Sequence, residues 1–195
     1  MNNASIRIGV LGEATIGRSE LINRICRPLN SAPSITNIQA GPTVDVLDFE
    51  RLEGGDNVWV EFLIIPSETR HPSSRQMLYS IGLDALILVC DSSVPRTFLR
   101  AAEWIEDASS TAGLQGVPIA IILDGSLAAD WKANTMLSSI IDPLVASRGA
   151  RVIDLSGCIS AAVLDTRQQR LLSLFYEHTI CSKAQKRTAT ADRVC

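Results

Sequence analysis

The sequence predicts an α/β domain built on a six-stranded, mainly parallel sheet, with one antiparallel edge strand and helices on both faces. Short apolar runs alternate with helical patterns along most of the chain, which is typical of a parallel sheet with crossover helices. Gly54-Gly55-Asp56-Asn57 separates two strand patterns and predicts a hairpin, which accounts for the antiparallel strand. A chain of 195 residues, 46% hydrophobic and 20% charged, suits a single globular domain.

The first half of the chain is predicted to contain three strands and one helix. Leu21, Ile22 and Ile25 share one helical face, and Pro28 lies near the end of that helix. A long loop rich in serine, asparagine, proline and glycine follows. The predicted elements are a buried strand over 5–11, a helix over 19–29, a loop over 30–42, strands over 44–52 and 58–65, and a polar loop over 66–74.

The second half is predicted to contain three strands and three helices. The apolar run from Ala85 to Cys90 indicates a central buried strand. Pro95 is tolerated in the first turn of a helix, whereas Pro143 should kink or shorten the helix that contains it. The predicted elements are strands over 84–91, 117–123 and 151–155, with helices over 95–109, 136–146 and 163–180.

The pattern predicts one domain over residues 1–181. Residues 182–195 lack an apolar face and are expected to form a disordered, mildly basic tail. No apolar run reaches the roughly 18 residues of a membrane helix, and the first eleven residues lack a signal-peptide pattern. The net charge of -3 gives no reason to expect nucleic acid or an anionic membrane as a partner.

The five cysteines are widely spaced and contain no Cys-x-x-Cys pair, so the sequence predicts neither a zinc site nor a disulfide framework. With no secretory signal, the expected compartment is the reducing cytoplasm. His71 and His178 are far apart in the sequence, and neither is expected to act in catalysis.

A phosphate-binding loop is predicted between the first strand and the first helix. The segment fits G-x-x-x-x-G-[KR]-[ST] and has the strand and helix on either side that this pattern requires. Glycines allow backbone N–H groups to face a phosphate, and a helix start adds positive potential. A glycine turn without a ligand is the alternative interpretation. The residues of the predicted site are Gly12, Glu13, Ala14, Thr15, Ile16, Gly17, Arg18 and Ser19.

The phosphate loop, together with Gly41-Pro42-Thr43-Val44-Asp45 and the runs 79–91 and 117–123, resembles the Ras superfamily of small GTPases, and within it the atypical Rab-like proteins. The resemblance covers residues 5 to 181 and implies a three-layer, Ras-like fold. The family has lysine where this chain has Arg18, and the larger, planar guanidinium is not an equivalent replacement. The resemblance places a possible magnesium ion at Ser19 and Thr43. Thr36 is a weaker candidate, and a strand-starting residue is the alternative interpretation of Thr43.

The motifs that hydrolyse GTP in this family are missing here. The family ends its third strand in Asp-x-x-Gly followed by glutamine, where this chain has Ile64-Ile65-Pro66-Ser67 followed by Glu68. The resemblance therefore implies that the magnesium-shell aspartate and the glycine N–H that meets the γ-phosphate are both absent. We expect no catalytic residue and no effective GTPase activity.

The guanine-recognition motif is also poorly kept. The family uses Asn-Lys-x-Asp and Ser-Ala-Lys, where this chain has Asp124-Gly125-Ser126-Leu127 and Ser156-Gly157-Cys158. Only Asp124 and Ser156 are left as candidate base contacts, although Asp130 lies close in sequence. The expected cofactor is GTP or GDP with magnesium, or no cofactor.

The sequence therefore predicts an atypical, GTPase-like binding or adaptor subunit of a protein complex. Resemblance to the Rab-like branch of intraflagellar transport, carried by 46–50, 94–95, 103–104 and 114–115, implies a cilium or flagellum as one location. A second atypical Rab-like branch competes, with a strand start like Val44-Asp45-Val46. Protein partners are expected at the switch-like loops and adjacent strands. The alternatives are a weakly hydrolysing GTP switch in vesicular or ciliary trafficking, and a different doubly wound protein that binds another phosphate ligand.

Overall fold

The computed structural model describes residues 5–13, 18–26, 43–52, 56–66, 77–91, 93–111, 114–124, 135–155, 164 and 166–191. Strands and helices alternate along the chain as the sequence predicts. The elements are β1 (Ser5–Gly12), α1 (Arg18–Cys26), β2 (Thr43–Glu50), β3 (Asn57–Ile64), β4 (Ala85–Asp91), α3 (Pro95–Ser109), β5 (Ile119–Asp124), α4 (Thr135–Arg148), β6 (Arg151–Asp154) and α5 (Thr166–Ala191).

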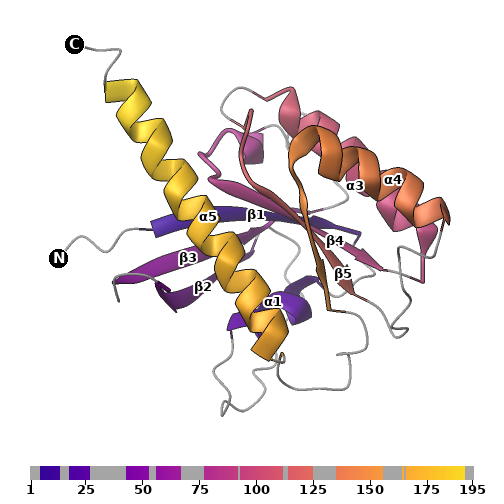
Figure 1. Ribbon diagram of the computed structural model, residues 1–195, viewed down its shortest axis with the longest axis horizontal. Coiled ribbons are helices and arrows are strands. Elements are labelled where there is room, and N and C mark those ends of the chain that lie inside the picture. Colours follow the sequence, from indigo (N-terminus) through magenta and orange to yellow (C-terminus); the bar gives the residue numbers. More distant parts are fainter. Residues whose placement is uncertain are drawn as a thin grey trace.

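The strands form one six-stranded sheet in the order β2-β3-β1-β4-β5-β6 (Figure 1). β2 and β3 pair in antiparallel register, with Thr43 opposite Ile64 and Glu50 opposite Asn57. The other four pairings are parallel. The predicted fold class, including the antiparallel edge strand, is therefore confirmed.

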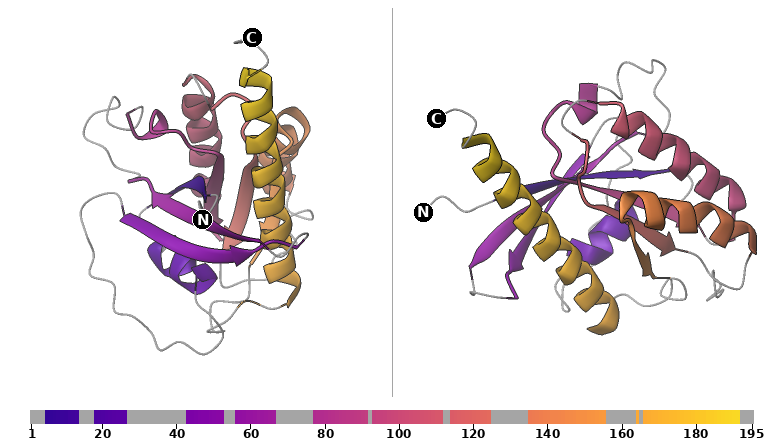
Figure 2. Two further views of the ribbon diagram at one scale, coloured as in Figure 1. Left: turned by 90° about the vertical axis from the view of Figure 1, so that its left-hand side faces the viewer. Right: turned by 45° about the horizontal axis from the view of Figure 1, so that its top comes forward.

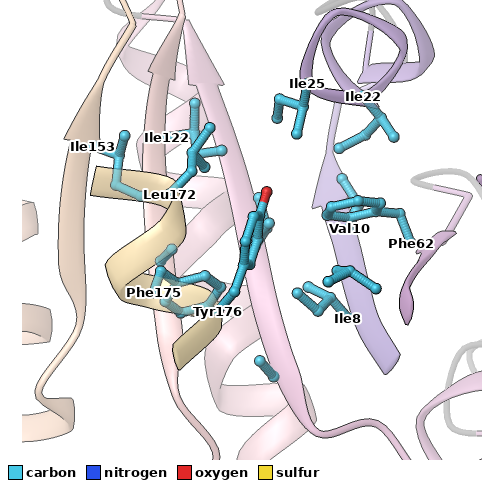
Figure 3. Close-up of a cluster of buried hydrophobic side chains, with 14 of the residues drawn as sticks. Ile8, Val10, Ile22, Ile25, Phe62, Ile122, Ile153, Leu172, Phe175 and Tyr176 are labelled. Atoms are coloured by element: carbon cyan, nitrogen blue, oxygen red, sulfur yellow. The ribbon is translucent and has the colours of Figure 1, made fainter. Parts of the chain in front are cut away.

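Helices cover both faces of the sheet, which gives the molecule three layers (Figure 2). α1 and α5 pack on one face, and Figure 3 shows Leu172, Phe175 and Tyr176 of α5 directed toward the strands. α3 and α4 pack on the opposite face. Alternate residues of β4 contribute to the two cores, which explains why its sequence is an unbroken apolar run.

α5 is longer than the sequence predicts, because it continues through residues 182–191 to Ala191. Lys183 Nζ donates to the carbonyl oxygen of Ser5 and to Asp84 Oδ2, both at 2.7 Å. Figure 1 shows this part of α5 beside the start of β1. The structure thus has a helix up to Ala191 where the sequence analysis expects a disordered tail, and the Lys183–Asp84 ion pair holds the first part of this extension. Residues 192–195 lie outside the described residues.

α4 also differs from expectation, because Pro143 does not shorten it. The helix runs past this proline to Arg148. Leu137 and Ile141 are buried in the core, and Leu144 packs against the same cluster on the far side of the proline. Core packing on both sides thus offsets the hydrogen bond that proline cannot donate.

Candidate functional site

The candidate site lies at the carboxyl end of β1, where the helices that follow two neighbouring strands lie on opposite faces of the sheet. β1 has β3 on one side and β4 on the other. The chain leaves β1 into α1 on one face of the sheet, whereas it leaves β4 into α3 on the opposite face. Ligands of open α/β sheets bind in the crevice that such a reversal leaves at the strand ends. The segment from Gly12 to Ser19 starts at this position.

Gly12, Glu13 and Arg18 of the predicted phosphate loop are fully described, and Ser19 is described for its backbone only. Gly12 ends β1, Glu13 follows it, and Arg18 begins α1. Ser19 lies in the first turn of α1, but its side chain is outside the description. Ala14, Thr15, Ile16 and Gly17 lie outside the described residues.

Arg18 passes directly over Gly12. A Cβ atom built on Gly12 would lie 2.9 Å from Arg18 Cδ, 3.2 Å from Arg18 Cγ and 3.0 Å from the carbonyl oxygen of Val89. Such distances leave no room for a side chain. Glycine at this position therefore serves the passage of the arginine stem as well as the turn.

The guanidinium group of Arg18 is bonded within the chain. Its Nη1 donates to the backbone carbonyl of Ile65, the residue after β3. Ile65 is itself held to β1, because its N–H donates to the Val10 carbonyl at 2.9 Å. Burial lowers the pKa of the Arg18 guanidinium from its ordinary value. Arg18 thus connects the start of α1 with the end of β3.

Glu13 faces a second element. Its Oε1 lies 3.5 Å from Arg96 Nε and 3.9 Å from Arg100 Nε, both on α3. Arg100 also pairs with Glu103 at 2.8 Å. Exposed pairs at such distances contribute little to stability, but they orient the Glu13 carboxylate toward α3. The sequence analysis missed Arg96 and Arg100, although their spacing of four residues places them on one helix face.

The other predicted site residues are only partly placed. Thr43 is the first residue of β2 and lies opposite Ile64, although its side chain is not described. Asp124 ends β5, is buried, and lies beside Asp91 in register. Ser156 lies outside the described residues, as do the alternative candidates Thr36, Glu68 and Asp130.

The described part of the site can be compared with the needs of a magnesium nucleotide, although the side chains of Ser19 and Thr43, the expected magnesium ligands, are outside the description. The cation of the loop is bonded to a backbone carbonyl, and a carboxylate follows Gly12. The described end of β3 offers Ile64, Ile65 and Pro66, none of which has a side chain that binds a metal ion. Within the ranges described, no three His, Cys, Asp or Glu side chains gather as a metal site.

A second surface is formed by the outer face of the β2–β3 hairpin, which we call the β2–β3 surface. It consists of Val44, Val46 and Trp59, which are 59%, 53% and 48% exposed. The register places Val44 opposite Leu63, Val46 opposite Glu61 and Asp48 opposite Trp59, so these residues share one face. Beside them, Glu61 pairs with Arg7 at 2.9 Å, and Arg7 also donates to the Ile81 carbonyl.

Beside the β2–β3 surface, β2 forms an edge of the sheet and carries acidic side chains. No other described strand pairs with the outer side of β2. β2 and β3 contain no lysine or arginine, whereas Asp48 and Glu50 are exposed on β2. Asp45 faces the inner side, where burial raises its pKa. Burial also raises the pKa of Cys26 in α1, and the charge of Asp45 adds to that rise. The apolar and acidic groups of β2 are thus available to a partner.

No helix in the described part of the chain is both long and apolar enough to span a membrane. A scan against protein-family models found no match, and a search of curated proteins found no significant similarity, so neither comparison assigns the chain to a family.

Proposed function

We propose that this chain is a small-GTPase-like binding subunit of a protein complex and that it engages its partner through the β2–β3 surface. The observation that carries the proposal is the exposure of Val44, Val46 and Trp59 beside the unpaired edge of β2. Large apolar side chains gathered on one face mark an interaction site more often than scattered ones do. An exposed strand edge offers backbone N–H and C=O groups to an added strand.

The partner is expected to present apolar and basic side chains. Asp48 and Glu50 are exposed along β2, and neither β2 nor β3 carries a positive charge. Complementary charge would steer the partner and set its register, whereas the apolar groups would supply most of the affinity. A second copy of this chain would instead place acidic strands side by side.

We also propose that this chain does not hydrolyse GTP effectively. By the resemblance, Ile64 stands where the family has the aspartate of the magnesium shell, and Ser67 stands where it has the glycine that meets the γ-phosphate. Arg18 is engaged with the Ile65 carbonyl. The resemblance to Rab-like proteins of intraflagellar transport leads us to propose a transport particle of the cilium or flagellum as the complex, with the cytoplasm as the wider location.

Affinity purification with surface variants tests this function. Tagged full-length chain is expected to recover transport-particle subunits and to label the cilium, and Val46→Asp and Trp59→Ala should both reduce recovery at least tenfold. Leu99→Asp is the matched control, since Leu99 is exposed to a similar degree but lies on α3. Recovery of no transport subunit, or equal loss with the α3 variant, would contradict the proposal.

The second candidate function is a GTP-binding switch with weak hydrolysis. It is favoured by the position of Gly12 and Arg18, which lie at the strand-to-helix turn where phosphate loops occur. This function requires GTP turnover that is lost in a Ser19→Ala variant. Turnover that is absent, or unchanged by that substitution, would dismiss it.

A further inference from the structure

We propose that Arg18 is an internal tie that joins the start of α1 to the end of β3, and that the domain therefore holds these two elements together without a nucleotide. This inference concerns the state of the isolated domain. It does not depend on which partner binds the β2–β3 surface.

The Arg18 contact lies where a ligand makes a similar connection in other proteins. In the small GTPases that the sequence resembles, the γ-phosphate connects the phosphate loop with the loop after the third strand. Here the Arg18 guanidinium reaches the carbonyl of Ile65, which is the first residue of that loop. A side chain of the protein thus makes the connection that a ligand makes elsewhere.

The residues around Arg18 leave room for its side chain and hold its acceptor in place. Gly12 leaves space for the Cγ and Cδ atoms of Arg18, which cross it at 3.2 and 2.9 Å from a built Cβ position. Ile65 is fixed from the other side by its N–H bond to the Val10 carbonyl. The acceptor therefore cannot move toward Arg18 without disturbing the pairing of β1 and β3, so the geometry is set in advance.

Arginine suits this contact better than the lysine that the resembling family has at this position. Removing a charged group from water is costly unless hydrogen bonds replace the lost hydration. A guanidinium is more weakly hydrated than an ammonium and presents donors in a fixed plane, so it suits a half-buried bond to a carbonyl better than lysine does. An arginine at the position of the family's phosphate-binding lysine is thus consistent with a structural contact.

Amide hydrogen exchange on the purified, nucleotide-free full chain tests the tie. An Arg18→Ala variant is expected to speed exchange at the Ile64 and Ile65 amides about tenfold, because a half-buried hydrogen bond from a charged group is lost. Exchange at Leu52, at the far end of the hairpin, should not change. An Arg18→Lys variant, which keeps the charge and is the less disruptive change, should show the same pattern.

Arg51→Ala is the matched control. Arg51 is another partly exposed arginine; it binds Glu177 at 3.1 Å, and Glu177 in turn accepts from the Leu52 N–H. This variant should speed exchange at Leu52 and leave Ile64 and Ile65 unchanged. The two arginines then give opposite patterns, which a general loss of stability would not produce.

Two outcomes would overturn the tie. One is unchanged Ile65 exchange in both Arg18 variants. The other is protection of Ile65 by magnesium with GTP, GDP or pyrophosphate in the wild-type chain but not in the variants, since Arg18 would then act as a phosphate ligand. Loss of partner binding in a Trp59 variant, by contrast, bears only on the proposed function.

Discussion

Glu13 and Arg18 are the described charged residues at the two ends of the turn after β1, and they connect it to different elements. Glu13 faces Arg96 and Arg100 on α3, and Arg18 binds the Ile65 carbonyl at the end of β3. The second contact is the stronger one, because it is more buried and is a direct hydrogen bond from a charged donor. At the level of single residues, Arg18 therefore makes the stronger of the two connections.

Cys90 gives a prediction for the dependence of stability on pH. Burial raises the pKa of its thiol to about 12. The folded state then keeps a proton that the unfolded chain releases from about pH 8.5. The stabilising contribution of this thiol is complete below that pH and declines toward pH 12, by about 1.4 kcal/mol per pH unit.

Urea denaturation between pH 8 and pH 11 measures this effect. Cys90→Ala should reduce the decline of unfolding free energy with pH, although Cys26, whose pKa is also raised to about 12, should retain part of it. Leu88→Val is the control, because it alters the same strand without an ionisable group and should lower stability equally at each pH. An unchanged decline in the Cys90 variant would contradict the assignment.

At the scale of elements, α5 holds the β2–β3 hairpin through Glu177. The Oε2 atom of Glu177 accepts from Arg51 Nη2 at 3.1 Å and Nε at 3.3 Å, and its Oε1 atom accepts from the Leu52 N–H at 2.8 Å. One carboxylate thus binds both the side chain and the backbone at the end of β2. Because the β2–β3 surface lies on this hairpin, the contact also fixes the orientation of the proposed partner site.

Substitution of Glu177 tests this contact. Glu177→Gln should lower the unfolding free energy by about 1–2 kcal/mol, because a charge-assisted bond pair on a mostly buried carboxylate is weakened. Thermal or urea denaturation measures the loss. Glu103→Gln, which breaks the exposed pair with Arg100, should cost no more than about 0.5 kcal/mol. Equal losses in the two variants would show that Glu177 is an ordinary surface residue.

The sequence predicts the elements well where local patterns decide them, and less well where distant contacts do. The apolar run of residues 85–90 and the glycine pattern that predicts a hairpin are local signals, and both the strand β4 and the antiparallel pairing of β2 with β3 are confirmed. In the extension of α5, Lys183 pairs with Asp84, which is 99 residues away, so no local pattern could reveal this contact.

The face of β2 is a further example. Val44 and Val46 alternate as residues of a core face would, yet they are exposed, and Asp45, Leu47 and Phe49 are on the inner side. A shift of one residue exchanges the faces of a strand, and only the pairing with β3 fixes the choice.

For the whole molecule, the candidate site could be located from the sequence, but its chemistry could not. The glycine pattern between a strand and a helix predicts the turn, and the topology places it at the reversal point of the sheet. The acceptor of the Arg18 hydrogen bond is the backbone carbonyl of Ile65, 47 residues away. Every residue has such a carbonyl, so the sequence cannot show which one is the acceptor. Arg18 could therefore be predicted as a cation near a phosphate, but its internal bond could not.

The central claim is that this α/β domain is complete without a nucleotide. Isothermal titration of the purified full-length chain with GTP and with GDP, each with and without magnesium, tests it most directly. The account predicts no saturable heat and no rise in melting temperature at millimolar nucleotide. Binding at micromolar concentration, with a melting temperature that rises with nucleotide concentration as mass action requires, would contradict it.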